Sequence, residues 1–246
     1  MKIRLVFVLA LVGLLVLGDV AVAQSIDARG LAAAGGGSYT ARLVQLMGLA
    51  TILSIAPGIV VTVTSFTRFV IAFSFLRTGL GLQSTPANIV MIALALFMTF
   101  FVMAPTLDAS WREGIAPLLD EQIDEGQAFT RAAAPLRDFM LKQVRPKDLE
   151  LFESLSRLDR ADPTAAPDLR VLVPAYMISE LRRGFEIGFL IALPFLIIDL
   201  VVATLVMSAG MMMMPPSVIA LPVKVVFFVL IDGWNLLVGN LIRSVS

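Results

Sequence analysis

Four ionisable side chains stand inside or beside apolar stretches, and they are the residues best placed to do chemistry. Lys224 and Asp232 lie in the last apolar stretch of the chain, Asp199 lies in the stretch before it, and Glu180 shortly precedes that one. A charged Lys in an apolar interior costs roughly 3 kcal/mol or more unless it is paired or hydrated. If the two stretches are helices that meet near Met213, Lys224 and Asp199 lie about 16 and 21 Å from the turn. Lys224 can therefore pair with Asp199 in its own chain or with Glu180 across a subunit boundary, and the sequence leaves both pairings open.

These charges suit two different roles. A buried ion pair, or a charged contact between subunits, would neutralise them without any part in transport. Alternatively, Asp199, Lys224 and Asp232 would form the relay of an ion-coupled small-molecule transporter. Of the two, the structural pair is the simpler interpretation.

The usual equipment of an enzyme is missing. The chain has no His and no Cys, which removes the commonest general base, the common metal ligands and any thiolate or disulfide. It also has no P-loop. An intramembrane hydrolase would lack a nucleophile with a base. We therefore expect no enzymatic activity, no cofactor and no metal site.

A run of methionines joins the last two apolar stretches. The turn begins at Gly210, ends at Pro215 and Pro216, and contains four consecutive thioether side chains, those of Met211, Met212, Met213 and Met214. Paired prolines between two long apolar segments predict a stiff turn and an antiparallel helical hairpin. Because Met is flexible and polarizable, one copy of this tip would be apolar filler, whereas several copies around an axis would form a deformable ring that seals a pore.

The composition indicates the class of protein that must position these residues. Of 246 residues, 58% are hydrophobic and 15% are charged, with a mean hydropathy of +0.90. Nineteen basic residues balance 19 acidic ones, so no basic field indicates a nucleic-acid partner. Because the apolar residues form long runs, we expect an all-α membrane protein.

The first part of the chain has the pattern of a secretory signal. Residues 1–23 contain a short basic start, an apolar stretch and a small-residue site that predicts cleavage between Ala23 and Gln24. An uncleaved anchoring helix is the alternative. Residues 24–41 are small and polar, which predicts a flexible mature N-terminus.

The remainder divides by composition into three parts. Residues 42–105 predict a first transmembrane hairpin, with a break near Pro57 and a second run closed by Pro105. Residues 106–186 are charged and amphipathic, which predicts a small α-helical region outside the membrane, on the periplasmic side. Residues 187–246 predict a second hairpin, and Gly184, Gly188, Gly233 and Gly239, in or just before it, would allow close helix packing. The chain would thus cross the membrane four times after the signal.

Several of these segments occur in an order that resembles the FliP family and its injectisome relatives. The resemblance begins near residue 45 and is densest over 174–240. The segments that carry it are 65–69 (SFTRF), 76–83 (LRTGLGLQ), 174–189 (PAYMISELRRGFEIGF), 194–201 (PFLIIDLV), 210–216 (GMMMMPP), 221–224 (LPVK) and 229–234 (VLIDGW).

The resemblance implies a pore-forming subunit of the flagellar type III protein-export gate, which passes unfolded flagellar subunits across the inner membrane. Helical hairpins of such subunits assemble into a ring-like helical oligomer of about five copies, together with FliR-like and FliQ-like subunits and an FlhB-like export protein. It further implies that Met211 to Met214 form the gasket of the pore. Glu180 and Lys224 match positions of charged contacts between subunits.

The location implied by the resemblance is the flagellar basal body in the bacterial inner membrane. The signal peptide and the long N-terminus are more similar to the flagellar branch of the family than to the injectisome branch. An injectisome homologue and the small-molecule transporter remain as alternatives.

Overall fold

The computed structural model describes residues 47, 54, 58–82, 86–156, 167–210 and 214–245. The chain divides into two units, 1–60 and 61–246, and every numbered helix below belongs to the second. The predicted signal peptide, with its cleavage site at Ala23 and Gln24, and the predicted flexible segment 24–41 lie outside the described residues.

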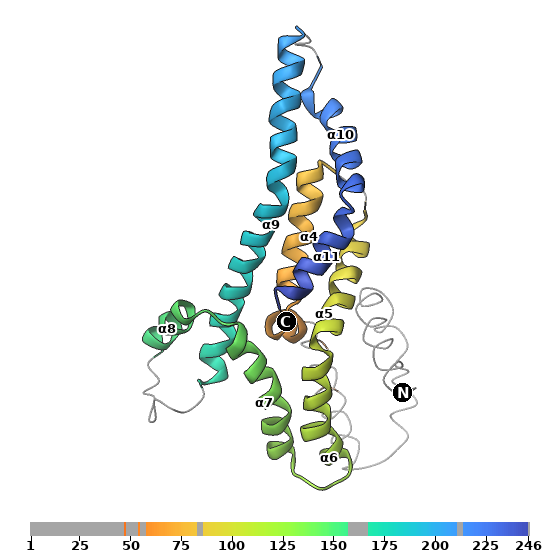
Figure 1. The fold of residues 1–246 in the computed structure, drawn as a ribbon. Helices are drawn as coiled ribbons and strands as arrows, with labels where there is room; N and C mark the ends of the chain where they lie inside the picture. Colours follow the sequence, from red (N-terminus) through yellow and green to blue (C-terminus); the bar gives the residue numbers. More distant parts are fainter. Residues whose placement is uncertain are drawn as a thin grey trace, which may run out of the picture. The chain divides into compact units, whose positions relative to one another are not determined.

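The described residues form helices and no strand, so the prediction of an all-α protein is confirmed for them. In chain order the elements are α4 (Phe66–Leu80), α5 (Asn88–Ser110), the π-helical segment η1 (Trp111–Ile115), α6 (Ala116–Leu119), α7 (Glu125–Gln143), α8 (Pro146–Leu155), α9 (Leu169–Ser208), α10 (Pro216–Leu230) and α11 (Gly233–Arg243) (Figure 1).

Local sequence signals explain several of the helix ends. The side chain of Asp124 accepts a 2.7 Å hydrogen bond from the backbone N–H of Gln127 and begins α7. Asp168 begins α9 in the same way, with a 2.8 Å bond from the N–H of Arg170. Both are N-caps that satisfy one free donor of the first turn. At the C-terminal end of α4, Gly81 adopts φ +76°, a left-handed conformation that favours glycine and ends the helix.

Two described helical segments are long and apolar enough to cross a membrane. They are residues 88–119, which run from α5 through η1 to α6, and α9. A third span exists only if α10 and α11, which are bent by 66° relative to each other, form one broken span. The expected four crossings are therefore corrected to two or three for the described part of the chain. Most of the residues before 58 in the expected first crossing lie outside it.

The first expected helix differs most from the sequence-based expectation. Residues 58–63 are helical, Thr64 and Ser65 break the helix, and α4 then has only 15 residues. Fifteen residues rise about 22 Å, which is short for a bilayer core of about 30 Å. The predicted break near Pro57 lies outside the described residues, and the break that the structure shows is at 64–65.

Proline proved a poor guide to helix ends here. Pro105 lies inside α5, so the expectation that it closes the second run is wrong. Pro174 and Pro194 likewise lie inside α9, a continuous helix of 40 residues that crosses the expected boundary at 186/187. In a membrane helix, neighbouring helices and local π adjustments can satisfy the backbone groups that a proline leaves free. The π-helical segment η1 follows Pro105 by six residues and packs on α7, where a Cβ on Gly114 would lie 2.5 Å from Ala132 Cβ.

The core of the unit lies between α4 and α9, which pack along most of the length of α4 (Figure 1). A Cβ on Gly184 would lie 3.1 Å from Ile71, and a Cβ on Gly188 would lie 2.6 Å from Phe75. The two α4 residues are four apart, as are the two glycines, so α4 and α9 run parallel. Their close approach depends on the absence of side chains at these glycines, as is common between membrane helices.

The last expected crossing is a bent pair of helices. Between α10 and α11, Asp232 adopts φ +52°, a conformation that Asp tolerates better than most residues. The next residue, Gly233, could not carry a Cβ without meeting the ring of Phe228 at 2.2 Å. A single straight span over 217–242 is therefore wrong, and the Asp-Gly pair explains the position of the bend.

Candidate functional site: the α9–α10 hairpin and its buried charges

The Met-rich turn lies at the end of a helical hairpin. α9 ends at Ser208, Gly210 follows with φ +73°, and Pro215 and Pro216 begin α10. Glycine suits this φ, and a proline in the first turn of a helix lacks a donor that would have no partner there. Of the four methionines, Met211, Met212 and Met213 lie outside the described residues. Met214 is described and is 45% exposed.

A small apolar cluster holds the two helices of the hairpin together below the turn. Val202 and Val206 of α9 pack with Ala220 of α10, and Ile198 and Ile219 lie against them. All five side chains are apolar, so they form no hydrogen bond or ion pair with one another. These residues therefore hold the two helices together only by apolar packing.

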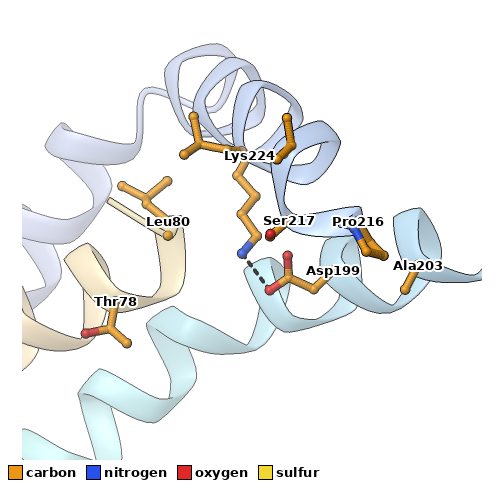
Figure 2. A pocket seen from close by; sticks show the side chains of 10 residues that line it. Thr78, Leu80, Asp199, Ala203, Pro216, Ser217 and Lys224 are labelled. Atoms are coloured by element: carbon orange, nitrogen blue, oxygen red, sulfur yellow. Dashed lines mark hydrogen bonds and ion pairs between the residues drawn. The ribbon is translucent and has the colours of Figure 1, made fainter. Parts of the chain in front are cut away.

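Lys224 lies deeper in the hairpin and is almost fully buried, with 5% of its surface exposed. Its ammonium donates a 2.6 Å hydrogen bond to Asp199 Oδ2 (Figure 2). It also donates a 2.9 Å bond to the carbonyl of Gly79 in α4. Of the two pairings that the sequence left open, the structure thus contains Lys224 with Asp199 in the same chain. Glu180 takes no part in this contact.

The pair borders a cavity of about 500 Å³ between the end of α4, α9 and the start of α10. Figure 2 shows the Asp199 carboxylate and Ser217 facing this space from the two sides of the hairpin. The Asp199 side chain is 41% exposed, whereas that of Lys224 is 6% exposed. Lys224 is therefore the member of the pair that cannot lose its partner without leaving a buried charge.

Glu180 pairs with Arg68 in a second buried ion pair. Both side chains have no exposed surface. Arg68 Nε donates a 2.9 Å bond to Glu180 Oε2, and its Nη2 donates to Oε1, so the guanidinium contacts the carboxylate through two parallel bonds. The pair joins α4 to α9.

Four further residues, partly buried or buried, complete this polar cluster. Arg68 Nη1 donates to the carbonyl of Ser244, just after α11, and its Nη2 donates a 3.1 Å bond to Gln143 Oε1. Gln143 also accepts from Arg183, and its Nε2 donates a 2.8 Å bond to the Val245 carbonyl. The cluster therefore ties α4, the end of α7, α9 and the segment after α11 together.

Sequence reasoning did not predict this cluster. Glu180 was expected as a partner of Lys224 across a subunit boundary, and Arg68 is recognisable only as a cation in an apolar block that needs some neighbour. Gln143 and Ser244 carry no comparable signal, because a neutral polar residue at a helix end has many roles in any sequence.

Asp232 lies apart from both pairs. It is exposed at the bend between α10 and α11, where its carboxylate accepts a 3.1 Å bond from Asn235 Nδ2. It does not line the cavity beside Asp199 and Lys224. The three residues that a transporter relay would require are therefore not gathered at one site in the described part of the chain.

Much of the hairpin surface is apolar and has no protein neighbour in this single chain. On α9 the exposed large apolar residues extend from Ile178 to Met207, and include Phe185, Phe189 and Leu200. On α10 they include Val218, Val226 and Val229. Such a surface marks contact with lipid or with other proteins.

The chain is similar to one protein family along most of its length. The FliP family model matches residues 49–241. The chain is 54% identical over 241 residues to "Flagellar biosynthetic protein FliP" of Rhizobium meliloti, covering 97% of this chain and 98% of that protein. Proteins of the same name from Agrobacterium fabrum and Bacillus subtilis are 58% identical over 211 residues and 50% identical over 201 residues, with 85% and 82% of this chain and 86% and 91% of those proteins covered. The resemblance found in the sequence is thereby confirmed, and the chain belongs to the FliP family.

Proposed function

We propose that the chain is a pore-forming subunit of the flagellar protein-export gate in the bacterial inner membrane, through which unfolded flagellar subunits pass. The name of its relatives, which assigns them to flagellar biosynthesis, supports the flagellar part of the proposal. The charges that a small-molecule transporter would need are not gathered at one site in the described residues, so the structure does not favour that alternative. The relatives named above favour the flagellar over the injectisome branch.

The length of the apolar face of α9 carries the proposal that the subunit works in an assembly. Exposed apolar side chains extend from Ile178 to Met207, which at roughly 1.5 Å per residue spans about 44 Å. The hydrocarbon core of a bilayer is only about 30 Å thick. An upright helix therefore has part of this face outside the hydrocarbon core, including the stretch around the exposed Arg182–Glu186 pair, and neighbouring subunits would cover the apolar residues there.

The proposed neighbours are further copies of this chain, about five in all, arranged as a ring-like helical oligomer. FliR-like and FliQ-like subunits and an FlhB-like export protein complete the complex. In such a ring the turns of the α9–α10 hairpins converge on the axis. Met211 to Met214 then form the gasket, because soft thioether side chains can close around a pore and still yield to chains of varied sequence.

The proposed arrangement along the chain follows the composition. Residues 1–23 are a signal peptide cleaved between Ala23 and Gln24, and 24–41 form a flexible start. Residues 42–105 and 187–246 form the two membrane hairpins, and 106–186 form the periplasmic helical region. Because α9 crosses residue 186 without a break, the last two parts would be joined rigidly. The chain supplies a passage and no catalytic step.

The gasket is tested by replacing Met211, Met212, Met213 and Met214 together with Ala in the complete export complex. We expect the complex to assemble and to leak small ions across the membrane, because short side chains leave the pore open. Met207→Ala is the matched control, since Met207 is 60% exposed on α9 but lies outside the turn. Unchanged conductance in the fourfold variant, with the complex assembled, would contradict the gasket.

A further inference from the structure

Lys224 does more than neutralise Asp199, because it also binds the end of another helix. Its ammonium donates a 2.9 Å bond to the carbonyl of Gly79, in the last turn of α4. The last carbonyls of a helix have no partner within the helix and carry the negative end of its dipole. Lys224 of α10 therefore caps α4 from outside.

With this contact, α4 is fixed to α9 near both of its ends. Near its beginning, Arg68 binds Glu180 of α9 directly. Near its end, Gly79 is linked to Asp199 of α9 through Lys224. The two carboxylates of α9 lie 19 residues apart, which corresponds to about 28 Å along the helix. The second link is the one that includes the hairpin, because Lys224 belongs to α10.

The described ends of the hairpin, where α9 ends at Ser208 and α10 begins at Pro216, lie beyond this second link. Asp199 precedes Gly210 by 11 residues and Lys224 follows Pro215 by nine, so Gly210 and Pro215 lie about 14 to 17 Å past the ion pair. Between the pair and the turn, the described buried contacts are those of the small apolar cluster of Val202, Val206 and Ala220. A small change of angle at the ion pair would therefore displace the described ends of α9 and α10 by several ångströms.

We infer that Lys224 is a positioning residue for the α9–α10 hairpin, which it ties to the C-terminal end of α4 through the Gly79 carbonyl and Asp199. Its consequence for a closed pore rests on the proposed function, whereas the geometric link does not. The role also differs from that of an ion pair that only stabilises the hairpin, because it requires a cation on α10 in particular.

Two double variants separate these roles. In Asp199→Leu with Lys224→Met both charges are gone, so no uncompensated buried charge remains to unfold the chain. In Asp199→Lys with Lys224→Asp the ion pair between α9 and α10 is kept, but a carboxylate now faces the Gly79 carbonyl and cannot donate to it. A stabilising pair would survive this exchange, whereas the cap on α4 would not.

The measurement is a pair of distances within one copy of the full chain. The sequence has no Cys, so introduced cysteines carry spin labels at unique positions. Ser74→Cys with Val223→Cys reports the distance between α4 and α10, and Leu205→Cys with Val223→Cys reports that between α9 and α10. All three residues are exposed. Labelled chains are diluted into unlabelled ones in membranes, so that only distances within one copy contribute.

We expect the parent chain to give one narrow peak for each pair. The apolar double variant should shift or broaden both distances. The exchanged pair should return the 205–223 distance to the parent value but leave the 74–223 distance shifted. Its assembled complex should leak ions. If the 74–223 distance shifts but neither this variant nor the fourfold Met variant leaks ions, the result would support the positioning role and contradict the gate. A 74–223 distance that stays at the parent value in both variants, or is restored by the exchange, would overturn the inference.

Discussion

The Arg68–Glu180 pair gives the strongest prediction for a single residue. Both side chains are fully buried, so Arg68→Ala leaves a carboxylate without its partner inside the protein. Breaking a buried pair on one side costs roughly 3–5 kcal/mol. We expect Arg68→Ala to lower the midpoint of thermal unfolding strongly, measured on the detergent-purified chain by the loss of helical circular dichroism.

The exposed pair on the same helix is the matched control. Arg182 Nε and Glu186 Oε1 lie 2.8 Å apart, but both side chains are more than half exposed. An exposed pair gains little in water, so Arg182→Ala should leave the unfolding midpoint close to that of the parent. Equal effects of Arg68→Ala and Arg182→Ala would show that the buried cluster does not hold the helices together.

The need for partners could be predicted from single residues, whereas the identity of the partners could not. Lys224 in an apolar stretch demands a counter-ion, and the helical rise from the turn brings Asp199 to a similar depth. Glu180 lies beyond the reach of that argument, because its partner Arg68 is 112 residues away in another helix. Only the parallel packing of α4 on α9 brings the two together, and no local pattern encodes it.

The helices themselves were predictable from composition, but several of their ends were not. Apolar runs in lipid must form helices, and the described residues agree. The prolines were misleading because a proline inside a helix costs only what its surroundings fail to compensate. Pro194 in α9 is followed by Phe195, which packs in the core with residues of α4. Asp232 and Gly233, by contrast, permit a left-handed turn and end α10.

Alanine substitutions at two glycines should have opposite effects on stability, because Gly188 lies in the α4–α9 contact and Gly126 is exposed on α7. A Cβ at Gly188 would lie 2.6 Å from the Phe75 ring, so Gly188→Ala forces the helices apart. Overpacking of this kind costs about 1–3 kcal/mol. At Gly126, in the first turn of α7, the nearest atom to a new Cβ is Asp124 Oδ1 at 3.4 Å. There Gly126→Ala should stabilise by up to about 1 kcal/mol, because Ala loses less conformational freedom on folding.

Thermal unfolding of the two variants checks this prediction, with Phe75→Ala as the test of its cause. If the Phe75 side chain is the obstacle, Gly188→Ala should cost less stability in the Phe75→Ala background than in the parent chain, because the ring and its Cγ no longer meet the new methyl group. An unaltered midpoint for Gly188→Ala would mean that α4 and α9 pack less closely than the structure shows.

For the whole molecule, the length of α9 sets a limit on how the chain can sit in a membrane. A helix of 40 residues is about 60 Å long, twice the thickness of the hydrocarbon core. Tilt reduces the mismatch only in part, since membrane helices tilt by about 20° on average. An isolated subunit would therefore leave apolar side chains in water, and assembly with other subunits removes this cost.

The two ends of the exposed apolar face of α9 test whether other subunits cover it. Ile178 and Met207 lie about 44 Å apart along the helix, so both cannot lie in a core of about 30 Å when the helix stands upright. If neighbouring subunits cover the face, Ile178→Asp and Met207→Asp should each reduce the yield of the purified oligomer, because a carboxylate would be buried at the interface without a partner.

Phe129→Asp in α7 is the control, since Phe129 is 70% exposed on a helix outside the candidate spans. Native mass spectrometry of the detergent-purified protein measures the number of copies. If both α9 variants gave an oligomer of the parent's size and yield, neither end of the face would lie at a subunit interface. The case for a ring built on this face would then fail.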